Sequence, residues 1–230
     1  MTTSFGILFA ALALLKPVPH ATAAKAAPAA MPRHLLLRVV TSVPVLERPR
    51  GTLLARVGTT TAFGSARVLS VLGRSGRWLQ VATGDVAGNR NGWVDGSDTG
   101  LARRSTELSI VVSLRRRQLE LLRGRRVVRT VRVGIGAPGS PTPVGQFAVT
   151  DKLHGPSYSQ AYGCCILALS AQQTHLPSGW HGGNRIAIHG TNVPSTIGEA
   201  VSTGCLHAAD TDLRYLFARV SLGTPVTIGA

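Results

Sequence analysis

Hydrophobic and polar residues alternate in short runs along most of the chain, which predicts a protein built mainly from β-strands. Five such runs lie in the first half, and each is bounded by glycine, proline or polar residues. They cover residues 35–40, 53–57, 67–72, 77–83 and 92–96. Five or so strands within about sixty residues predict a small β-barrel.

The second half continues with strands and one helix. Residues 108–112 form a predicted strand, and a hairpin follows at 118–122 and 127–133, joined through Arg123, Gly124 and Arg125. Further strands are expected at 145–149, 186–189 and 225–228. A helix is expected over about 211–220, because its apolar residues fall on one face, with Asp210 as its cap. The polar stretch 97–105 predicts a boundary between a domain at 34–98 and one at 106–230.

The N-terminal segment resembles an export signal. Residues 5–15 form an apolar run that is too short to span a bilayer comfortably. Ala21 and Ala23 then match the small-residue pattern of a cleavage site. We therefore expect a signal peptide over 1–23, a linker over 24–33, and an exported protein of the cell envelope. Because no basic residue precedes the run and Lys16 follows it, an uncleaved membrane anchor is the alternative.

The net charge is +15, from 25 lysines and arginines against 10 acidic residues. The arginines are spread over most of the chain, and no helix-turn-helix or RNA-recognition pattern is present, so we expect no specific nucleic-acid partner. A basic surface instead favours polyanions in general, including anionic cell-wall polymers. Around the 123–125 turn, arginines are also typical of a protected sheet edge.

Three cysteines are too few for a disulfide framework. Cys164 and Cys165 are neighbours, whose Cα atoms lie about 3.8 Å apart, whereas disulfides prefer about 5.5 Å. The two could pair with each other, bind a metal with histidines, or pack in the core. No spaced Cys or His pair supports a metal site, and none is expected. Cys205 is predicted to be a free thiol.

Residues 185–210 contain the parts of a cysteine active site. His189 ends an apolar strand and is followed by Gly190, and Cys205 comes sixteen positions after His189. This pattern predicts Cys205 as nucleophile and His189 as its base. The small residues before Cys205 permit a tight turn, so the backbone N–H groups of Thr203, Gly204 and Cys205 are candidates for an oxyanion hole.

Several motifs together resemble the catalytic domain of the L,D-transpeptidases, the YkuD-type fold. In chain order they are Thr142-Pro143-Val144-Gly145-Gln146-Phe147, Ile188-His189-Gly190-Thr191, Ser202-Thr203-Gly204-Cys205-Leu206 and Gly223-Thr224-Pro225-Val226-Thr227-Ile228. The earlier half resembles a bacterial SH3-like domain through Trp78-Leu79-Gln80-Val81 and Gly92-Trp93-Val94. The implied architecture is mainly β: an SH3-like barrel followed by a YkuD-type β-sandwich with one or two short helices.

The resemblance also implies a reaction that needs no cofactor. Cys205 would attack a peptidoglycan stem peptide, release its terminal D-alanine and pass the acyl group to an amine, forming a cross-link. The backbone carbonyl of Gly190 would orient His189, and carbapenems would acylate Cys205 as covalent inhibitors. The residues expected to meet substrate are Tyr162, Ser202 and His207.

Two positions depart from the family pattern. Thr203 stands where the family usually has His, and His207 stands where it usually has Arg or Asn. Two alternatives to the transpeptidase therefore stay open. One is an L,D-carboxypeptidase that uses water as acceptor, and the other is a non-catalytic basic scaffold that binds the cell wall.

Overall fold

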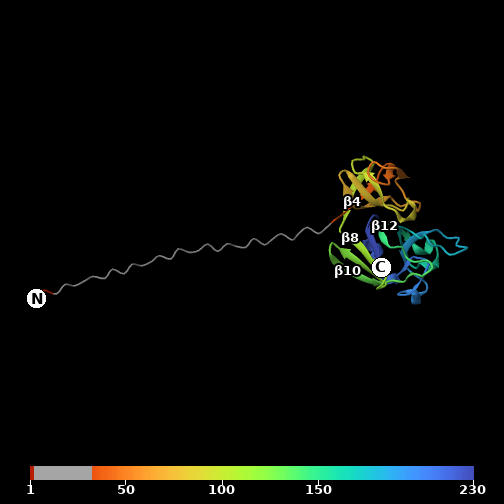
Figure 1. Ribbon diagram of the computed structural model, residues 1–230. Coiled ribbons are helices and arrows are strands. Elements are labelled where there is room, and N and C mark those ends of the chain that lie inside the picture. Colours follow the sequence, from red (N-terminus) through yellow and green to blue (C-terminus); the bar gives the residue numbers. More distant parts are fainter. Residues whose placement is uncertain (3–32) are drawn as a thin grey trace. The chain divides into compact units, whose positions relative to one another are not determined.

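The computed structural model describes residues 1–2 and 33–230, so the predicted signal peptide and nearly all of the predicted linker lie outside the described residues. Within the described part, no helix is long and apolar enough to cross a membrane. From residue 34 on, the chain forms two large β-sheets, and each has its own hydrophobic core (Figure 1). The prediction of a mainly β protein is confirmed.

The first sheet has seven antiparallel strands in the order β3-β2-β6-β5-β4-β1-β7. The strands are β1 His34–Val39, β2 Val43–Leu46, β3 Leu53–Val57, β4 Val68–Ser75, β5 Trp78–Ala82, β6 Gly92–Asp95 and β7 Leu101–Thr106, and the 3₁₀ turn η1 is Ala87–Asn89. Alternation places Val43, Val45, Leu79 and Val81 in its core. The sheet extends beyond residue 98, because β7 lies in the expected boundary and pairs with β1.

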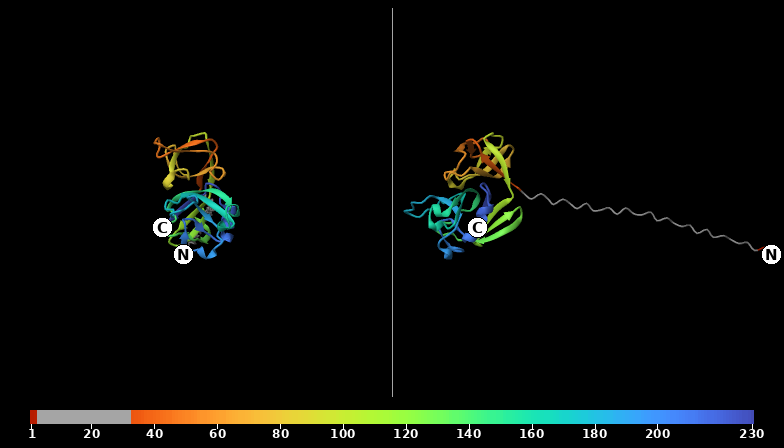
Figure 2. Two further views of the ribbon diagram at one scale, coloured as in Figure 1. Left: turned by 90° about the vertical axis from the view of Figure 1, so that its right-hand side faces the viewer. Right: turned by 180° about the vertical axis from the view of Figure 1, so that it is seen from behind.

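The second sheet has eight strands in the order β10-β9-β8-β17-β12-β13-β14-β16. Figure 2 shows these later strands, coloured green to blue, as a group of their own. They are β8 Leu108–Ser113, β9 Gln118–Arg123, β10 Arg126–Arg132, β12 Gly145–His154, β13 Cys165–Gln172, β14 Arg185–His189, β16 Leu206–His207 and β17 Pro225–Gly229. The short strands β11 Ile135–Gly136 and β15 Ala200–Ser202 form a separate parallel pair.

One α-helix and three 3₁₀ turns complete this half of the chain. They are α1 Asp210–Arg219, η2 Gly155–Ser157, η3 Gln160–Tyr162 and η4 Pro194–Thr196. Leu213 and Leu216 of α1 are fully buried in the core of the second sheet. Strand β13 is buried along nearly all of its length. Its neighbour β14, which carries His189, is therefore attached to the least exposed part of the sheet.

Asp210 does not cap this helix as the sequence predicts. The N-cap is Ala209, which makes no side-chain capping bond, and Asp210 is the first helical residue. Its Oδ1 instead accepts a hydrogen bond from the backbone N–H of Cys164, 3.1 Å away. The carboxylate thus fixes a neighbouring loop, a tertiary contact that local sequence does not reveal.

Hydrogen bonds connect the loops of the first sheet to β13 and β14. The side chain of Asn89 donates to the carbonyl of Gln172 at 2.8 Å and accepts from its N–H at 2.6 Å. The Gln172 amide donates to the carbonyl of Gly84 at 2.7 Å, and Arg185 reaches the same oxygen at 3.4 Å. Polar groups at the start of β14 are therefore satisfied in part by the first half of the chain.

Candidate active site

His189 is placed by β14, whose residues Ile186, Ala187 and Ile188 are buried. Its side chain is itself buried, and its Nδ1 lies 2.6 Å from the carbonyl oxygen of Gly190, the partner that the sequence predicts. Because a carbonyl only accepts, Nδ1 carries the proton and Nε2 has a free lone pair. The imidazole is thereby held in the tautomer that a general base needs.

Close packing requires glycine at position 190, whereas any residue would supply the carbonyl that His189 uses. A Cβ at this position would lie 2.1 Å from Oδ1 of Asp210 and 2.9 Å from the Cα of Gly163. Any larger residue would displace the carboxylate that holds Cys164, or move the backbone that orients His189.

Cys205 follows a tight turn that Ser202 holds together. The Ser202 hydroxyl donates to the carbonyl of Cys205 at 2.6 Å and accepts from the N–H of Gly204 at 3.1 Å. Gly204 has φ = 106°, in the range that favours glycine. The Cys205 Sγ lies 3.9 Å from the carbonyl oxygen of Arg185, which acts as its hydrogen-bond acceptor.

Two buried side chains that the sequence did not single out also support this turn. The Gln173 amide donates to the carbonyls of Pro141 and Thr203, both at 3.1 Å. The Thr142 hydroxyl donates to the carbonyl of Gly204 at 2.8 Å. Thr142 is the first residue of a motif by which the sequence resembles the L,D-transpeptidases, so its role could have been predicted. No feature of the neighbouring sequence indicates the role of Gln173.

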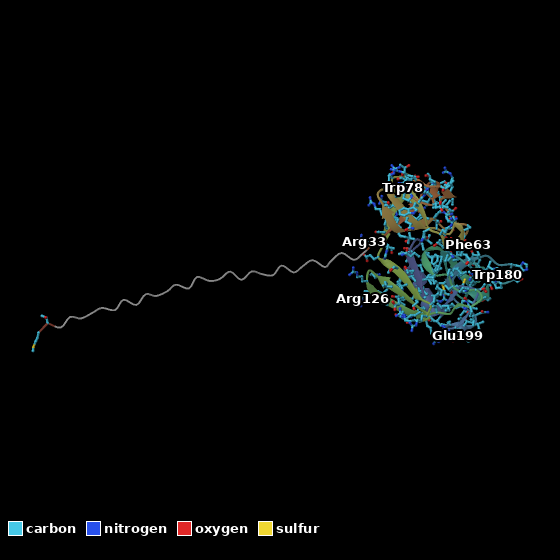
Figure 3. The ribbon with its side chains drawn as sticks, in the orientation of Figure 1. Arg33, Phe63, Trp78, Arg126, Trp180 and Glu199 are labelled. Atoms are coloured by element: carbon cyan, nitrogen blue, oxygen red, sulfur yellow. A yellow bond between two sulfur atoms is a disulfide. The ribbon has the colours of Figure 1, made fainter. Side chains whose placement is uncertain are left out.

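The predicted site residues meet in one cleft of about 350 Å³. Its lining includes Cys205, His189, His207, Tyr162, Ser202 and Thr203. Trp180 also lines it, from the loop between β13 and β14 that projects from the second sheet (Figure 3). A second hollow of about 190 Å³ reaches Cys205 too, and Tyr158 and Tyr162 contribute aromatic walls. Cys205 therefore borders two hollows.

Burial keeps both reacting groups uncharged at neutral pH. Loss of solvent lowers the pKa of His189 to about 4, with the hydrogen bond to Gly190 opposing the shift and His207 adding to it. Burial raises the pKa of the Cys205 thiol to about 11. The resting site thus holds a thiol and a neutral imidazole rather than a preformed ion pair.

His207 lies directly beside the base. Its ring centroid is 4.8 Å from that of His189, and its Nδ1 is 3.0 Å from the Thr196 hydroxyl. Burial lowers its pKa as well. Tyr162 contacts His189 from another direction, edge to face, with the ring centroids 4.9 Å apart. Tyr162 and His207, two of the three residues expected to meet substrate, therefore adjoin the imidazole.

One expectation for the turn needs correction. The N–H of Gly204 donates to Ser202 Oγ, so it is not a free oxyanion donor. The Ser202 hydroxyl is engaged within the turn, so Ser202 positions the turn as well as lining the cleft. Among the described residues, the N–H groups of Thr203 and Cys205 have no hydrogen-bond partner and are the remaining candidates.

The other two cysteines are bonded to each other. Cys164 and Cys165 form a disulfide, which decides among the alternatives left open by the sequence, and Cys205 is a free thiol as predicted. In residues 33–230 no group of three or more His, Cys, Asp or Glu side chains is placed to hold a metal ion.

The fold and site together define a β-protein with a buried thiol and imidazole in one cleft. Residues 107–228 match the family model of the YkuD L,D-transpeptidase catalytic domain, and the chain belongs to this family.

The chain is similar to several proteins that bear the L,D-transpeptidase name. YkuD of Bacillus licheniformis is 37% identical over 119 residues, which is 52% of this chain and 64% of that protein. YcfS of Escherichia coli is 31% identical over 46% of this chain and 38% of its own length. Among solved structures, LdtMt1 in complex with imipenem aligns with a TM-score of 0.45 and 20% identity, over 72% of this chain and 92% of that one. The matched segment thus covers less than two thirds of the length of YkuD and of YcfS.

Proposed function

We propose that the protein is a peptidoglycan L,D-transpeptidase that works through an acyl-enzyme on Cys205. The observation that carries the proposal is the hydrogen bond from His189 Nδ1 to Gly190, which leaves Nε2 free as a base in the cleft that holds Cys205. Membership of the family supplies the substrate class, the stem peptides of the wall.

The first half-reaction forms a thioester. The Cys205 sulfur bonds to the carbonyl carbon after the third residue of the stem, while the thiol proton passes to His189 Nε2. The carbon–nitrogen bond to the terminal D-alanine then breaks, and the leaving amine takes that proton. The N–H groups of Thr203 and Cys205 would stabilise the oxyanion between these events.

The second half-reaction transfers the acyl group. The amine of a neighbouring stem attacks the thioester and gives a proton to His189, the carbon–sulfur bond breaks, and the proton returns to the sulfur. Water in place of the amine would make the protein a carboxypeptidase. Because burial disfavours the ion pair of thiolate and imidazolium, proton transfer would accompany attack in this mechanism.

The remaining assignments belong to the same proposal. The first sheet would be an SH3-like domain, and the protein would be exported and act in the cell envelope. Its net charge of +15 would favour contact with anionic wall polymers. Retention of both His189 and Cys205 disfavours the scaffold alternative, because a scaffold needs no base beside a free thiol.

The test is intact-protein mass spectrometry on the whole chain and on Cys205→Ala. Each is incubated with a carbapenem and, separately, with a disaccharide-tetrapeptide. We expect one carbapenem adduct on the wild type and none on the variant, with D-alanine released by the wild type alone. Dimeric muropeptide products would identify a transpeptidase, and tripeptide a carboxypeptidase. A folded wild type with a titratable thiol that forms no adduct and releases no D-alanine would refute the proposal and favour the scaffold.

A further inference from the structure

A third hollow, which does not include Cys205, is lined mainly by arginines. It has a volume of about 440 Å³ and is bounded by Arg115, Arg116, Arg117 and Arg132, with Gln118 and Thr130. Three of the arginines are consecutive in the turn between β8 and β9, and Arg132 ends β10. The basic side chains therefore enter from two separate segments and surround one space.

The turn holds these arginines in an ordered but unusual conformation. Arg117 has φ = 49°, the left-handed region that normally selects Gly or Asn. Its N–H donates to the carbonyl of Leu114 at 3.1 Å, and its own carbonyl accepts from Val133 at 2.9 Å. For a residue with a Cβ this conformation is strained, and the two backbone hydrogen bonds hold it in place.

The hollow carries uncompensated positive charge. Arg116 lies 3.8 Å from Glu120, and Arg117 lies 3.3 Å from Glu199, whose position Figure 3 marks. Arg115 and Arg132 are exposed, and neither has a carboxylate partner within the described part of the chain. Four guanidinium groups against two carboxylates favour an anionic ligand.

Guanidinium groups that enter from two segments suit a phosphate, whose tetrahedral oxygens accept hydrogen bonds from several directions. We propose that this arginine pocket binds the phosphate groups of a soluble anionic polymer that carries successive phosphodiesters. Binding does not require the activity proposed above, because Cys205 is no part of the pocket.

The pocket lies across one loop from the active-site cleft. Gly198 lines the pocket, and its carbonyl accepts a hydrogen bond from Arg117 Nη1 at 2.5 Å. Thr196 of the same loop lines the cleft and bonds His207. A polymer held here would therefore lie next to the place where stem peptides react.

The test is the binding of a fluorescently labelled glycerol phosphate oligomer to the whole chain, followed by anisotropy. The double variant Arg115→Gln/Arg132→Gln is compared with the control Arg38→Gln/Arg56→Gln. The control removes the same charge from exposed positions on β1 and β3. We expect roughly tenfold or greater weakening in the first variant, from lost charge-assisted hydrogen bonds, and less than about twofold in the control. The slope of log affinity against log salt should fall by about two only in the first.

Three results would overturn the proposal. Equal weakening in both double variants would assign the affinity to the whole basic surface. Equally tight binding of a polyglutamate of matched length would refute the preference for phosphate. Binding to phosphatidylglycerol vesicles but not to the oligomer would refute the soluble polymer as ligand. Cys205→Ala should bind the oligomer as the wild type does, which separates this result from any failure of the catalytic proposal.

Discussion

At the residue scale, His189 has only one ring nitrogen available for chemistry. Nδ1 is committed to the Gly190 carbonyl, so in the proposed mechanism the basicity of Nε2 would determine the pH at which the site is active. A base must be unprotonated to accept the thiol proton, and burial lowers the pKa of His189 to about 4. Activity that depends on this base should therefore persist to lower pH than an exposed histidine would allow.

That reasoning gives a prediction for the pH dependence of acylation. The second-order rate of carbapenem acylation should stay nearly constant from about pH 7 to about pH 5 and fall only as His189 protonates. In His207→Asn the pH at which the acylation rate begins to fall should rise by less than about one unit. The reason is that the charge of His207, which lowers the pKa of His189, is removed.

Stopped-flow acylation of wild type, His207→Asn and Thr196→Val provides the measurement. Thr196→Val removes the hydroxyl partner of His207 while keeping its imidazole, so it controls for loss of that hydrogen bond. If the acylation rate fell at the same pH in wild type and His207→Asn, electrostatic coupling between the two rings would be contradicted.

The sequence predicted residues that meet in the cleft but not everything that holds them. Cys205 and His189 were predicted together because the proposed chemistry needs a thiol and a base, and both line the same cleft. Gly190 was predicted as the partner of His189, and its carbonyl accepts the hydrogen bond from Nδ1. Gln173 was missed, because the two hydrogen bonds by which it supports the turn go to Pro141 and Thr203, which are distant from it in sequence. Gly204 was assigned an oxyanion role that its bond to Ser202 excludes, since spacing predicts a turn but not the partner of each N–H.

At the scale of elements, the turn before Cys205 depends on the absence of a side chain at Gly204. Its φ is 106°, and a Cβ would lie 2.4 Å from Gln173 Nε2 and 2.8 Å from Ile186 Cδ1. Gly204→Ala should lower the free energy of unfolding by about 2 kcal/mol or more, because strain and a clash act together. It should also slow carbapenem acylation through displacement of the sulfur.

Urea denaturation gives the first quantity and adduct formation the second. Gly139→Ala is the matched control, since a Cβ there meets no atom within 4 Å and the glycine has no positive φ. Equal stability of the two variants would show that the turn tolerates a side chain and that its geometry does not depend on Gly204.

The pattern of hydrophobic and polar residues predicted several elements of the second half well. The strands β8, β9 and β10, the strand β17 and the helix α1 lie within a few residues of their expected positions. Prediction failed for β7, because its sequence LARRST is largely polar and its strand character comes from pairing with β1. The strand β12 runs to His154, beyond the expected end at residue 149, because β13 pairs along its second half.

At the scale of the whole molecule, stability should depend on pH through the two buried reacting groups. Unfolding restores His189 to its ordinary pKa of 6.5, whereas the folded value is about 4. Between these values the unfolded chain binds more protons than the folded one, so stability is lost as pH falls through this window. Cys205 acts in the opposite range: its thiol ionises near pH 9 when unfolded and near 11 when folded, so stability falls as pH rises between them.

We therefore expect the free energy of unfolding to be highest between about pH 6.5 and 9, with a loss of order 2–3 kcal/mol toward pH 4 from His189. Urea denaturation at several pH values measures the curve. The acid loss should shrink in His189→Gln, which buries a side chain that cannot take up the proton. It should be unchanged in His175→Gln, which replaces an exposed histidine. If the unfolding free energy fell by the same amount toward pH 4 in both variants, groups other than His189 would control the loss. A smaller loss in His189→Gln alone would show that the burial that keeps the base neutral for chemistry also makes the fold sensitive to acid.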